Sequence, residues 1–385
     1  MNITPFAAYC VMGGGVMDLT RRKIGLALSG GGIRAMVFHL GVLKWMAEQG
    51  CLENIRHISS ASGGSLVVGL IYAKNDFAWP SSEDFLARIL PEISEIILQK
   101  DLQIAALVRL FPFWIHRKVK LLARMIGKKW NVVGKMEQIA ANPIWSINCT
   151  TYETGNRFEI NQNQMSDSSI GTTPSGNMPI AHAMAASAGF PILIGPYPLR
   201  RDRHEWSASG ITPPIWAWAD NRIPGGRFFN LWDGGVYDNM GLEPLFGITN
   251  SGANLAAGVD FIIISNAGAS SKYAHRLFST SLRRLLDIAM DQAENLRIRE
   301  AISHFQQNDN GMFLPIGANA GQILRNAPLN PDEKREIITS CLPGHQTIRA
   351  RNHPTNLRRP TPQTFANLLR HGYETAKCTH ISGGF

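Results

Sequence analysis

The sequence predicts an α/β fold, a three-layer α/β/α arrangement in which helices cover both faces of a mostly parallel central sheet. Short apolar strands are expected at 24–28 and 55–61, and each leads through a glycine-containing turn into a helix. A further apolar run at 259–268 predicts another buried strand. Alternation of strands with helices is typical of parallel sheets, because two parallel strands need a long crossover connection between them.

Composition bounds the size and the class of the protein. Its 385 residues, of which 44% are hydrophobic and 17% charged, are enough for one large α/β domain with an insertion or for two domains. No apolar run approaches the roughly 20 residues that span a bilayer. The five cysteines include no C-x-x-C pair, which indicates neither a zinc site nor a disulfide framework and favours a reducing, cytoplasmic compartment. The net charge of +9 favours an acidic partner, either a membrane surface or nucleic acid.

The chain divides into segments of different composition. Residues 1–21 lack the basic start of a signal peptide and predict a flexible leader. Residues 22–316 are expected to form the main domain, with a helical, aromatic and basic cap insertion at 77–135. Within this domain, residues 161–177 are polar and predict an irregular stretch. Residues 317–385 are expected to form a linker rich in Pro, Asn and Arg, followed by a C-terminal helix that packs on the main domain.

Three consecutive glycines at 30–32 separate the first strand from its helix. Because N–H groups at the start of a helix lack internal partners, a glycine turn there presents them to a cofactor phosphate or to an oxyanion formed during a reaction. Gly30, Gly32 and Ala35 fit the dinucleotide pattern G-x-G-x-x-[GA], but the second strand ends in serines and not in an acidic residue that would bind a ribose. A P-loop is excluded because no Lys-Ser or Lys-Thr follows. A simple tight turn remains an alternative, although three glycines give more backbone freedom than a turn needs.

The second strand ends in "SASGG", which differs from the G-x-S-x-G pattern only because Ser60 stands in place of the first glycine. That pattern puts a serine on a strained strand-to-helix turn, where small neighbours leave its hydroxyl exposed. Ser62 is therefore expected at the same sheet edge as the glycine loop, since the carboxyl ends of neighbouring parallel strands open onto one crevice. A nucleophile facing a group of N–H donors is the arrangement that acyl transfer requires.

A nucleophilic serine needs a base, and Asp233 is the best candidate. It ends an apolar strand and is followed by two glycines. An Asp-Gly pair often only forms a turn, but beside a glycine loop and a serine elbow the catalytic interpretation is favoured. His57 is separated from Ser62 by roughly 16 Å of strand and points to the opposite face. His39 and His182 lie in predicted helices and are expected to be packing or surface residues.

Together these motifs resemble the patatin-like phospholipases. "GGGIRA" at 30–35, "SASGG" at 60–64 and "DGG" at 233–235 occur in the order found in that family, and "ASAGFP" around Ser187 matches a further family block. The resemblance extends over roughly residues 22–378 and implies a patatin-like fold. Its one departure within these motifs is Ser60, which puts the strength of the activity in question.

The resemblance also implies a function. The family's Ser–Asp dyad, which uses no histidine, falls on Ser62 and Asp233. The residues matching its oxyanion hole are Gly30, Gly31, Gly32 and Gly63. The implied activity is a lipid acyl hydrolase of phospholipase A type that cleaves fatty-acyl esters through an acyl-enzyme and needs no metal or cofactor. An alternative is a lipid-binding or regulatory protein on the same scaffold with little activity. Arg34 is expected either to bind the substrate phosphate or to form a surface ion pair.

A basic amphipathic helix is predicted at 113–129. Its apolar residues share one face, its basic residues share the opposite face, and Trp114 and Trp130 flank it. Such a helix suits the surface of an anionic membrane, as expected of a peripheral membrane protein in the cytoplasm. The predicted contact residues are Trp114, Arg117, Lys120, Arg124 and Lys128. The alternative is a cap helix with a solvated basic face. Nucleic-acid binding is disfavoured because the sequence contains no recognised motif for it.

Overall fold

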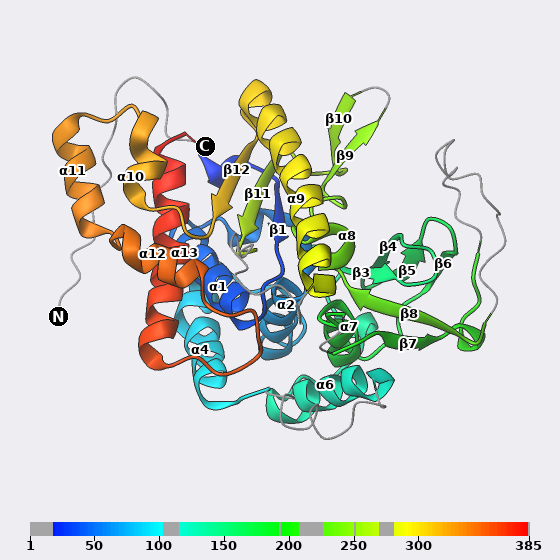
Figure 1. The fold of residues 1–385 in the computed structure, drawn as a ribbon. Coiled ribbons are helices and arrows are strands. Elements are labelled where there is room, and N and C mark those ends of the chain that lie inside the picture. The colour runs from blue at the N-terminus through cyan, green and yellow to red at the C-terminus, as the bar shows by residue number, and fades with distance from the viewer. Residues whose placement is uncertain are drawn as a thin grey trace.

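A ten-stranded mixed sheet organises the protein (Figure 1). The computed structural model describes residues 18–102, 115–191, 194–207, 226–249, 252–268 and 281–383. The main path of the sheet has the order β12-β11-β1-β2-β3-β4-β5-β6, while β8 pairs with both β3 and β7. Its strands are β1 (Ile24–Leu28), β2 (Ile55–Ala61), β3 (Ile144–Thr151), β4 (Arg157–Ile160), β5 (Gln164–Asp167), β6 (Gly171–Pro174), β7 (Tyr197–Arg200), β8 (Phe228–Asp233), β11 (Phe261–Asn266) and β12 (Gly311–Pro315). A separate antiparallel pair is formed by β9 (Phe246–Thr249) and β10 (Gly252–Leu255).

The first five strands of that path, β12 to β3, are parallel, and the remaining pairings are antiparallel. The helices are α1 (Gly32–Glu48), α2 (Gly63–Lys74), α3 (Ser82–Asp84), α4 (Leu90–Gln99), α6 (Ile115–Lys129), α7 (Ile180–Ser187), α8 (Gly235–Asp238), α9 (Ser281–Asn308), α10 (Ala320–Ile323), α11 (Pro331–Ser340), α12 (Gly344–Arg351) and α13 (Pro362–Ile381). This mostly parallel α/β arrangement confirms the predicted fold class. None of the described helices combines the length and the apolar character needed to cross a bilayer.

The alternation of side chains along the central strands produces three layers. Leu26 and Leu28 of β1 belong to the large core that also contains α1 and α2. Ala27, which points to the opposite face of the same strand, packs in a smaller core with Phe305 of α9. Because successive strand residues point to opposite faces, one apolar strand supports a helical layer on each side.

Two glycines allow a close contact between α1 and α13, which lie against each other (Figure 1). A Cβ atom on Gly41 would collide with the carbonyl oxygen of Leu369, and one on Gly372 would collide with that of Phe38. The C-terminal helix therefore packs on the helix that follows the glycine loop.

Two segments are more regular than predicted. Residues 161–177 contain β5 and β6, because the carboxylate of Asp167 accepts hydrogen bonds from the hydroxyl groups of Thr151 and Thr154 and organises the polar turn. The linker expected after residue 316 contains α10, α11 and α12. Asn319 and Asn330 each begin a helix there with a capping box, which the polar composition concealed. Residues 1–17 of the predicted leader lie outside the described residues.

Candidate active site

The sheet brings Ser62 and Asp233 together at the edge of β3. Parallel strand β2 ends with Ala61 opposite Asn148. Antiparallel strand β8 ends with Asp233 opposite Cys149, the next residue of β3. The two strand ends therefore meet head to head along one edge of β3. Ser62, which follows Ala61, lies close enough to Asp233 for its side chain to lower the pKa of that carboxyl.

Ser62 occupies a sharp turn between β2 and α2, as the elbow pattern predicts. Its φ of 48° and ψ of −114° are strained for a residue with a side chain. The glycines after it make this turn possible. A Cβ atom on Gly63 would lie 2.5 Å from the carbonyl oxygen of Gly32, and one on Gly64 would collide with that of Leu28. The start of α2 therefore approaches the backbone of β1 and of the glycine loop more closely than side chains would permit.

Asp233 is buried and held in a fixed orientation. Its side chain is 2% exposed, and its Oδ1 accepts a hydrogen bond of 2.8 Å from the N–H of Gly235. Loss of solvent on burial raises the pKa of Asp233 to about 7, although the hydrogen bonds from Gly235 and Ser62 act in the opposite direction. A carboxylate with a pKa near neutrality can accept the proton of an attacking hydroxyl and return it later in a reaction.

The glycine loop lies against Ser62, since a Cβ atom on Gly30 would be 3.2 Å from the Cβ of Ser62. The N–H of Gly30 donates to the carbonyl oxygen of Asn239 at 2.9 Å, so the prediction that Gly30 supplies an oxyanion donor is wrong. Gly31 and Gly32 adopt positive φ values of 142° and 59°. Within the described part of the chain, the N–H groups of Gly31, Gly32 and Gly63 have no hydrogen-bond acceptor. These three N–H groups are therefore available as hydrogen-bond donors beside Ser62.

The sequence patterns did not predict a cluster of hydrogen-bonded side chains behind the glycine loop, formed by Asn239, Asn266 and Glu294. Glu294 of α9 accepts a hydrogen bond of 3.0 Å from the side-chain amide of Asn239 and one of 2.7 Å from that of Asn266. Asn266 in turn accepts the N–H of Gly268 at 2.8 Å. Loss of solvent raises the pKa of Glu294. Only Asn239 carried a sequence signal, because it follows the "DGG" motif closely, whereas Glu294 resembles any charge on a surface helix.

Arg34 has partners other than those expected from the sequence. It is 4% exposed, and its Nε donates to the carbonyl oxygen of Ala267 at 3.1 Å. Its Nη1 donates to the carbonyl oxygens of Arg351, at 3.2 Å, and His353, at 2.8 Å. The guanidinium thus links the start of α1 to two distant loops, because this turn of α1 is buried beneath them. The structure supports neither a surface ion pair nor contact with a substrate phosphate.

The histidines are engaged elsewhere, as predicted. His57 Nε2 lies 2.8 Å from Ser146 Oγ, and both nitrogens of the buried His39 have partners in the core. His182 Nδ1 lies 2.9 Å from the hydroxyl of Tyr197. None of these three side chains hydrogen-bonds to Ser62 or Asp233 in the described structure.

Helix α6 packs on α7 at the lower edge of the molecule in the view of Figure 1. Its apolar face is buried through Val119, Leu122 and Ile126. Trp130, predicted to flank a membrane-facing helix, is 1% exposed and donates its indole N–H to a backbone carbonyl at 3.4 Å. Trp130 therefore faces the core and not a membrane, because the apolar side of α6 packs in the core. On the basic side, Arg124 and Lys128 are exposed and Lys120 is half-exposed. Trp114 and the side chain of Arg117 lie outside the described residues.

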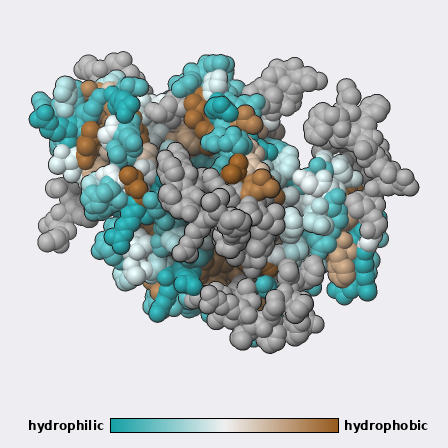
Figure 2. Space-filling model, in the orientation of Figure 1, coloured by the Kyte–Doolittle hydropathy of each residue, from teal (hydrophilic) through white to brown (hydrophobic). Residues whose placement is uncertain are grey.

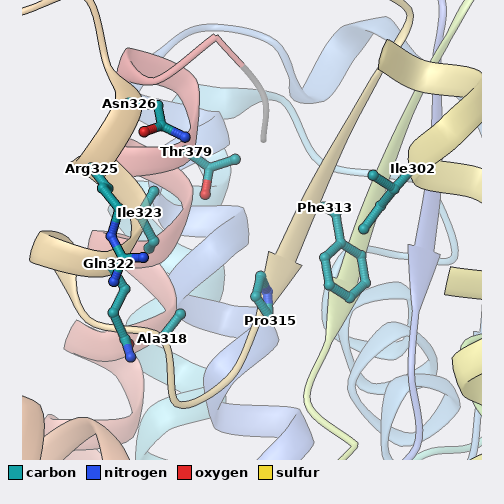
Figure 3. A pocket seen from close by; sticks show the side chains of 9 residues that line it. All are labelled: Ile302, Phe313, Pro315, Ala318, Gln322, Ile323, Arg325, Asn326 and Thr379. Carbon is teal, nitrogen blue, oxygen red and sulfur yellow. The ribbon is translucent and has the colours of Figure 1, made fainter. Parts of the chain in front are cut away.

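A cavity of about 340 Å³ lies away from Ser62 and Asp233, between α9, β12, α10 and α13 (Figure 3). Phe313, Pro315, Ile323 and Thr379 are among its lining residues, and Arg325 lies at the same site. Figure 2 shows small separate hydrophobic patches on the face that it draws. Leu285 and Leu296 of α9 are exposed. Neither Ser62 nor Asp233 lines the cavity.

Comparisons with known proteins agree with the geometry. The family model described as "Patatin-like phospholipase" matches residues 26–246. Human GIVD cytosolic phospholipase A2 aligns with a TM-score of 0.53 and 14% sequence identity, covering 94% of this chain and 59% of the human chain. VipD from Legionella pneumophila aligns with a TM-score of 0.36 and 14% identity, covering 94% of this chain and 67% of that one. A search of curated protein sequences returned no match.

At 14% identity the human structure supports the fold alone, and this chain spans about three fifths of it. The family match is broader evidence, because it extends over more than half of the chain and includes the glycine loop, the serine elbow and Asp233. The chain belongs to the patatin-like phospholipase family.

Proposed function

We propose that the protein is a lipid acyl hydrolase of phospholipase A type that cleaves fatty-acyl esters with the dyad Ser62–Asp233. The observation that carries the proposal is the meeting, at adjacent residues of β3, of a serine on a strained turn and a buried aspartate whose pKa is about 7. Free N–H groups of the glycine loop lie beside that pair. A nucleophile, a base and oxyanion donors are the groups that acyl transfer needs.

In the proposed reaction, Asp233 accepts the hydroxyl proton of Ser62 as Oγ attacks the ester carbonyl carbon. The N–H groups of Gly31, Gly32 and Gly63 stabilise the negative oxygen of the tetrahedral intermediate. Collapse of the intermediate breaks the ester C–O bond, and the alcohol leaves with the proton held by Asp233. Water then gives a proton to Asp233 and attacks the acyl-enzyme, which releases the fatty acid and restores the Ser62 hydroxyl.

The proposed substrate surface is an anionic membrane that contacts the basic face of α6. Arg124 and Lys128 project from that face, whose opposite side packs on α7. Since α7 ends at Ser187, whose hydroxyl accepts the N–H of Ser62, α6 is one helix away from the elbow. Contact at this face would bring acyl esters near the dyad, as expected of a peripheral membrane protein in the cytoplasm.

An activity-based probe distinguishes this function from its alternative, a lipid-binding protein with little activity. We expect a fluorophosphonate to label the wild-type protein at Ser62 and not to label Ser62→Ala, because only an activated serine reacts. Incubation with vesicles of mixed phospholipids, followed by mass spectrometry of the products, would identify the released fatty acids. Vesicle binding without labelling and without products would favour the lipid-binding alternative.

A further inference from the structure

A chain of buried hydrogen bonds lies beneath the serine elbow and ends on the backbone of Ser62. The indole N–H of Trp145 donates to Ser60 Oγ at 2.9 Å, and Ser60 Oγ lies 2.9 Å from Ser65 Oγ. Ser65 Oγ lies 2.9 Å from Ser187 Oγ, and the Ser187 hydroxyl donates to the carbonyl oxygen of Asn148 at 2.7 Å. The N–H of Ser62 donates to Ser187 Oγ at 3.0 Å. The chain connects β2, α2, β3 and α7 at the point where Ser62 leaves the sheet.

The end groups fix the direction of every hydrogen bond in this chain. The indole N–H of Trp145 can only donate, and the carbonyl of Asn148 can only accept. Ser187 therefore gives its single proton to Asn148, and its oxygen accepts from both Ser65 and the N–H of Ser62. Each hydroxyl upstream donates in the same direction, so the network has one arrangement of protons.

All the side chains in this network are closed to solvent. Trp145, Ser60, Ser65 and Ser187 each have 0% exposure. A buried donor that loses its acceptor has no water to replace it, and that loss is costlier than the loss of a solvated hydrogen bond. A glycine at position 60, as in the G-x-S-x-G pattern, would leave the indole N–H of Trp145 without its acceptor.

Ser187 also reaches the other half of the dyad. Its carbonyl oxygen accepts the N–H of Gly234, the residue after Asp233, at 3.2 Å. Two residues later, the carbonyl of Gly189 accepts the N–H of Asp233 itself at 3.2 Å. The end of α7 therefore holds the backbone at both Ser62 and Asp233.

We propose that Ser60, Ser65 and Ser187 are positioning residues, which hold the strained Ser62 turn so that its Oγ stays directed at Asp233. Strained backbone persists only where its surroundings over-determine it, and the Ser62 N–H has its partner in Ser187. Ser60 is then needed as the hydrogen-bond acceptor of Trp145, and its presence in place of the glycine does not weaken the activity. This inference rests on the proposed hydrolase function.

The test compares kcat, KM and melting temperature among variants of the three serines in the hydrogen-bond network, with a soluble p-nitrophenyl ester as substrate. We expect kcat to fall about 30-fold in Ser187→Ala, about tenfold in Ser65→Ala and about fivefold in Ser60→Gly, with KM within about twofold of the wild-type value. The expected loss of kcat becomes smaller with each hydrogen bond that separates the serine from Ser62. The melting temperature should not show this order, since all three hydroxyls are equally buried. Ser146→Ala, which removes another buried hydroxyl of β3, should lower the melting temperature and leave kcat unchanged.

A double-mutant cycle tests the role of Ser60 in a different way. Trp145→Phe keeps an aromatic ring and removes the buried N–H, so that Ser60→Gly in that background should lower kcat less than twofold. If Ser187→Ala does not fold, this cycle alone tests whether the hydrogen-bond network positions Ser62.

Two results would overturn the proposal. A Ser60→Gly variant with unchanged or higher kcat would show that the serine merely replaces the glycine. Variants that lose melting temperature but keep kcat, as Ser146→Ala should, would show that the chain only supports folding. A wild-type protein that a fluorophosphonate does not label at Ser62 would instead overturn the hydrolase function, and the positioning role with it.

Discussion

Gly30 and Asn239 are joined by a backbone hydrogen bond of 2.9 Å that ties the glycine loop to the segment after Asp233. The side chain of Asn239 is in turn held by Glu294 of α9. Asn239 thus connects the glycine loop, the segment after Asp233 and α9, which lies on the far side of the sheet. The geometry of the loop consequently depends on a glutamate that lies outside the proposed chemistry.

We expect Glu294→Gln to lower kcat of the soluble ester about tenfold with little change in KM. Both carboxylate oxygens of Glu294 accept from asparagine amides, and a glutamine would turn an NH₂ group towards one of these donors. The matched control is Glu300→Gln on the same helix, where the side chain is exposed. Equal kcat in the two variants would show that the cluster of Asn239, Asn266 and Glu294 does not position the glycine loop.

Removing either dyad residue should abolish ester hydrolysis. We expect Ser62→Ala and Asp233→Asn each to lower kcat by at least about 1,000-fold, while the double variant is no worse than either single one, because the two residues act as a unit. Circular dichroism would establish that the folds are intact. A double variant markedly slower than both singles would contradict the dyad, as would an equal loss in His57→Ala or His182→Ala.

The pKa of Asp233 predicts how activity depends on pH. Since the base must be ionised to accept the serine proton, kcat/KM should rise with pH and level off above about 7, the value to which burial raises this pKa. The measurement is a pH–rate profile with an ester whose own hydrolysis is subtracted. A profile already level between pH 5 and 8 would mean that Asp233 is not the base.

The same buried carboxyl predicts a trend in stability. Its folded pKa lies above its unfolded value, so the native state holds a proton that the unfolded state has lost between about pH 4 and 7. Stability should therefore fall as pH rises through that window. Asp233→Asn should remove this contribution and melt at a higher temperature than the wild type at pH 8, with a smaller difference at pH 4. Parallel melting curves across this range would contradict the assignment.

Charge on α6 should control binding to anionic vesicles. A basic side chain near an anionic surface contributes about 1 kcal/mol, so changing Lys120, Arg124 and Lys128 together to glutamine should weaken binding roughly 100-fold at low salt. Turnover of the soluble ester should be unchanged, and added salt should mimic the substitutions because it screens these charges.

A control with the same loss of charge keeps this test specific. Arg325, Arg335 and Arg349 are exposed and lie away from α6, so their replacement by glutamine should affect vesicle binding much less. Equal weakening by the two triple variants would indicate a general effect of net charge. Loss of soluble-ester turnover in the α6 variant would mean that the helix has a structural role.

The sequence predicted the strained turn at Ser62, because its signal is local. Ser62 follows a strand and Asp233 ends one, each beside glycines, and a strained or tight turn demands such neighbours wherever it occurs. The hydrogen bond that the Gly30 N–H donates could not be predicted in this way, because its acceptor, the carbonyl oxygen of Asn239, belongs to a distant segment. Arg34 was misassigned for the same reason, since its carbonyl acceptors lie up to 319 positions away. Trp130 was misassigned because amphipathic spacing alone does not say which environment the apolar face meets.

The contact between the start of α1 and the segment before α13 has a consequence for how the protein is made. The carbonyl of Asn356 accepts the N–H of Ile33 at 2.9 Å, next to the glycines that are proposed to stabilise the reaction intermediate. During translation, the ribosome adds this acceptor long after Ser62 and Asp233 have emerged. A growing chain thus contains the proposed nucleophile and base before the segment that braces the glycine loop has been synthesised, so the proposed hydrolytic activity should be complete only after residues 351–356 have been added and have docked.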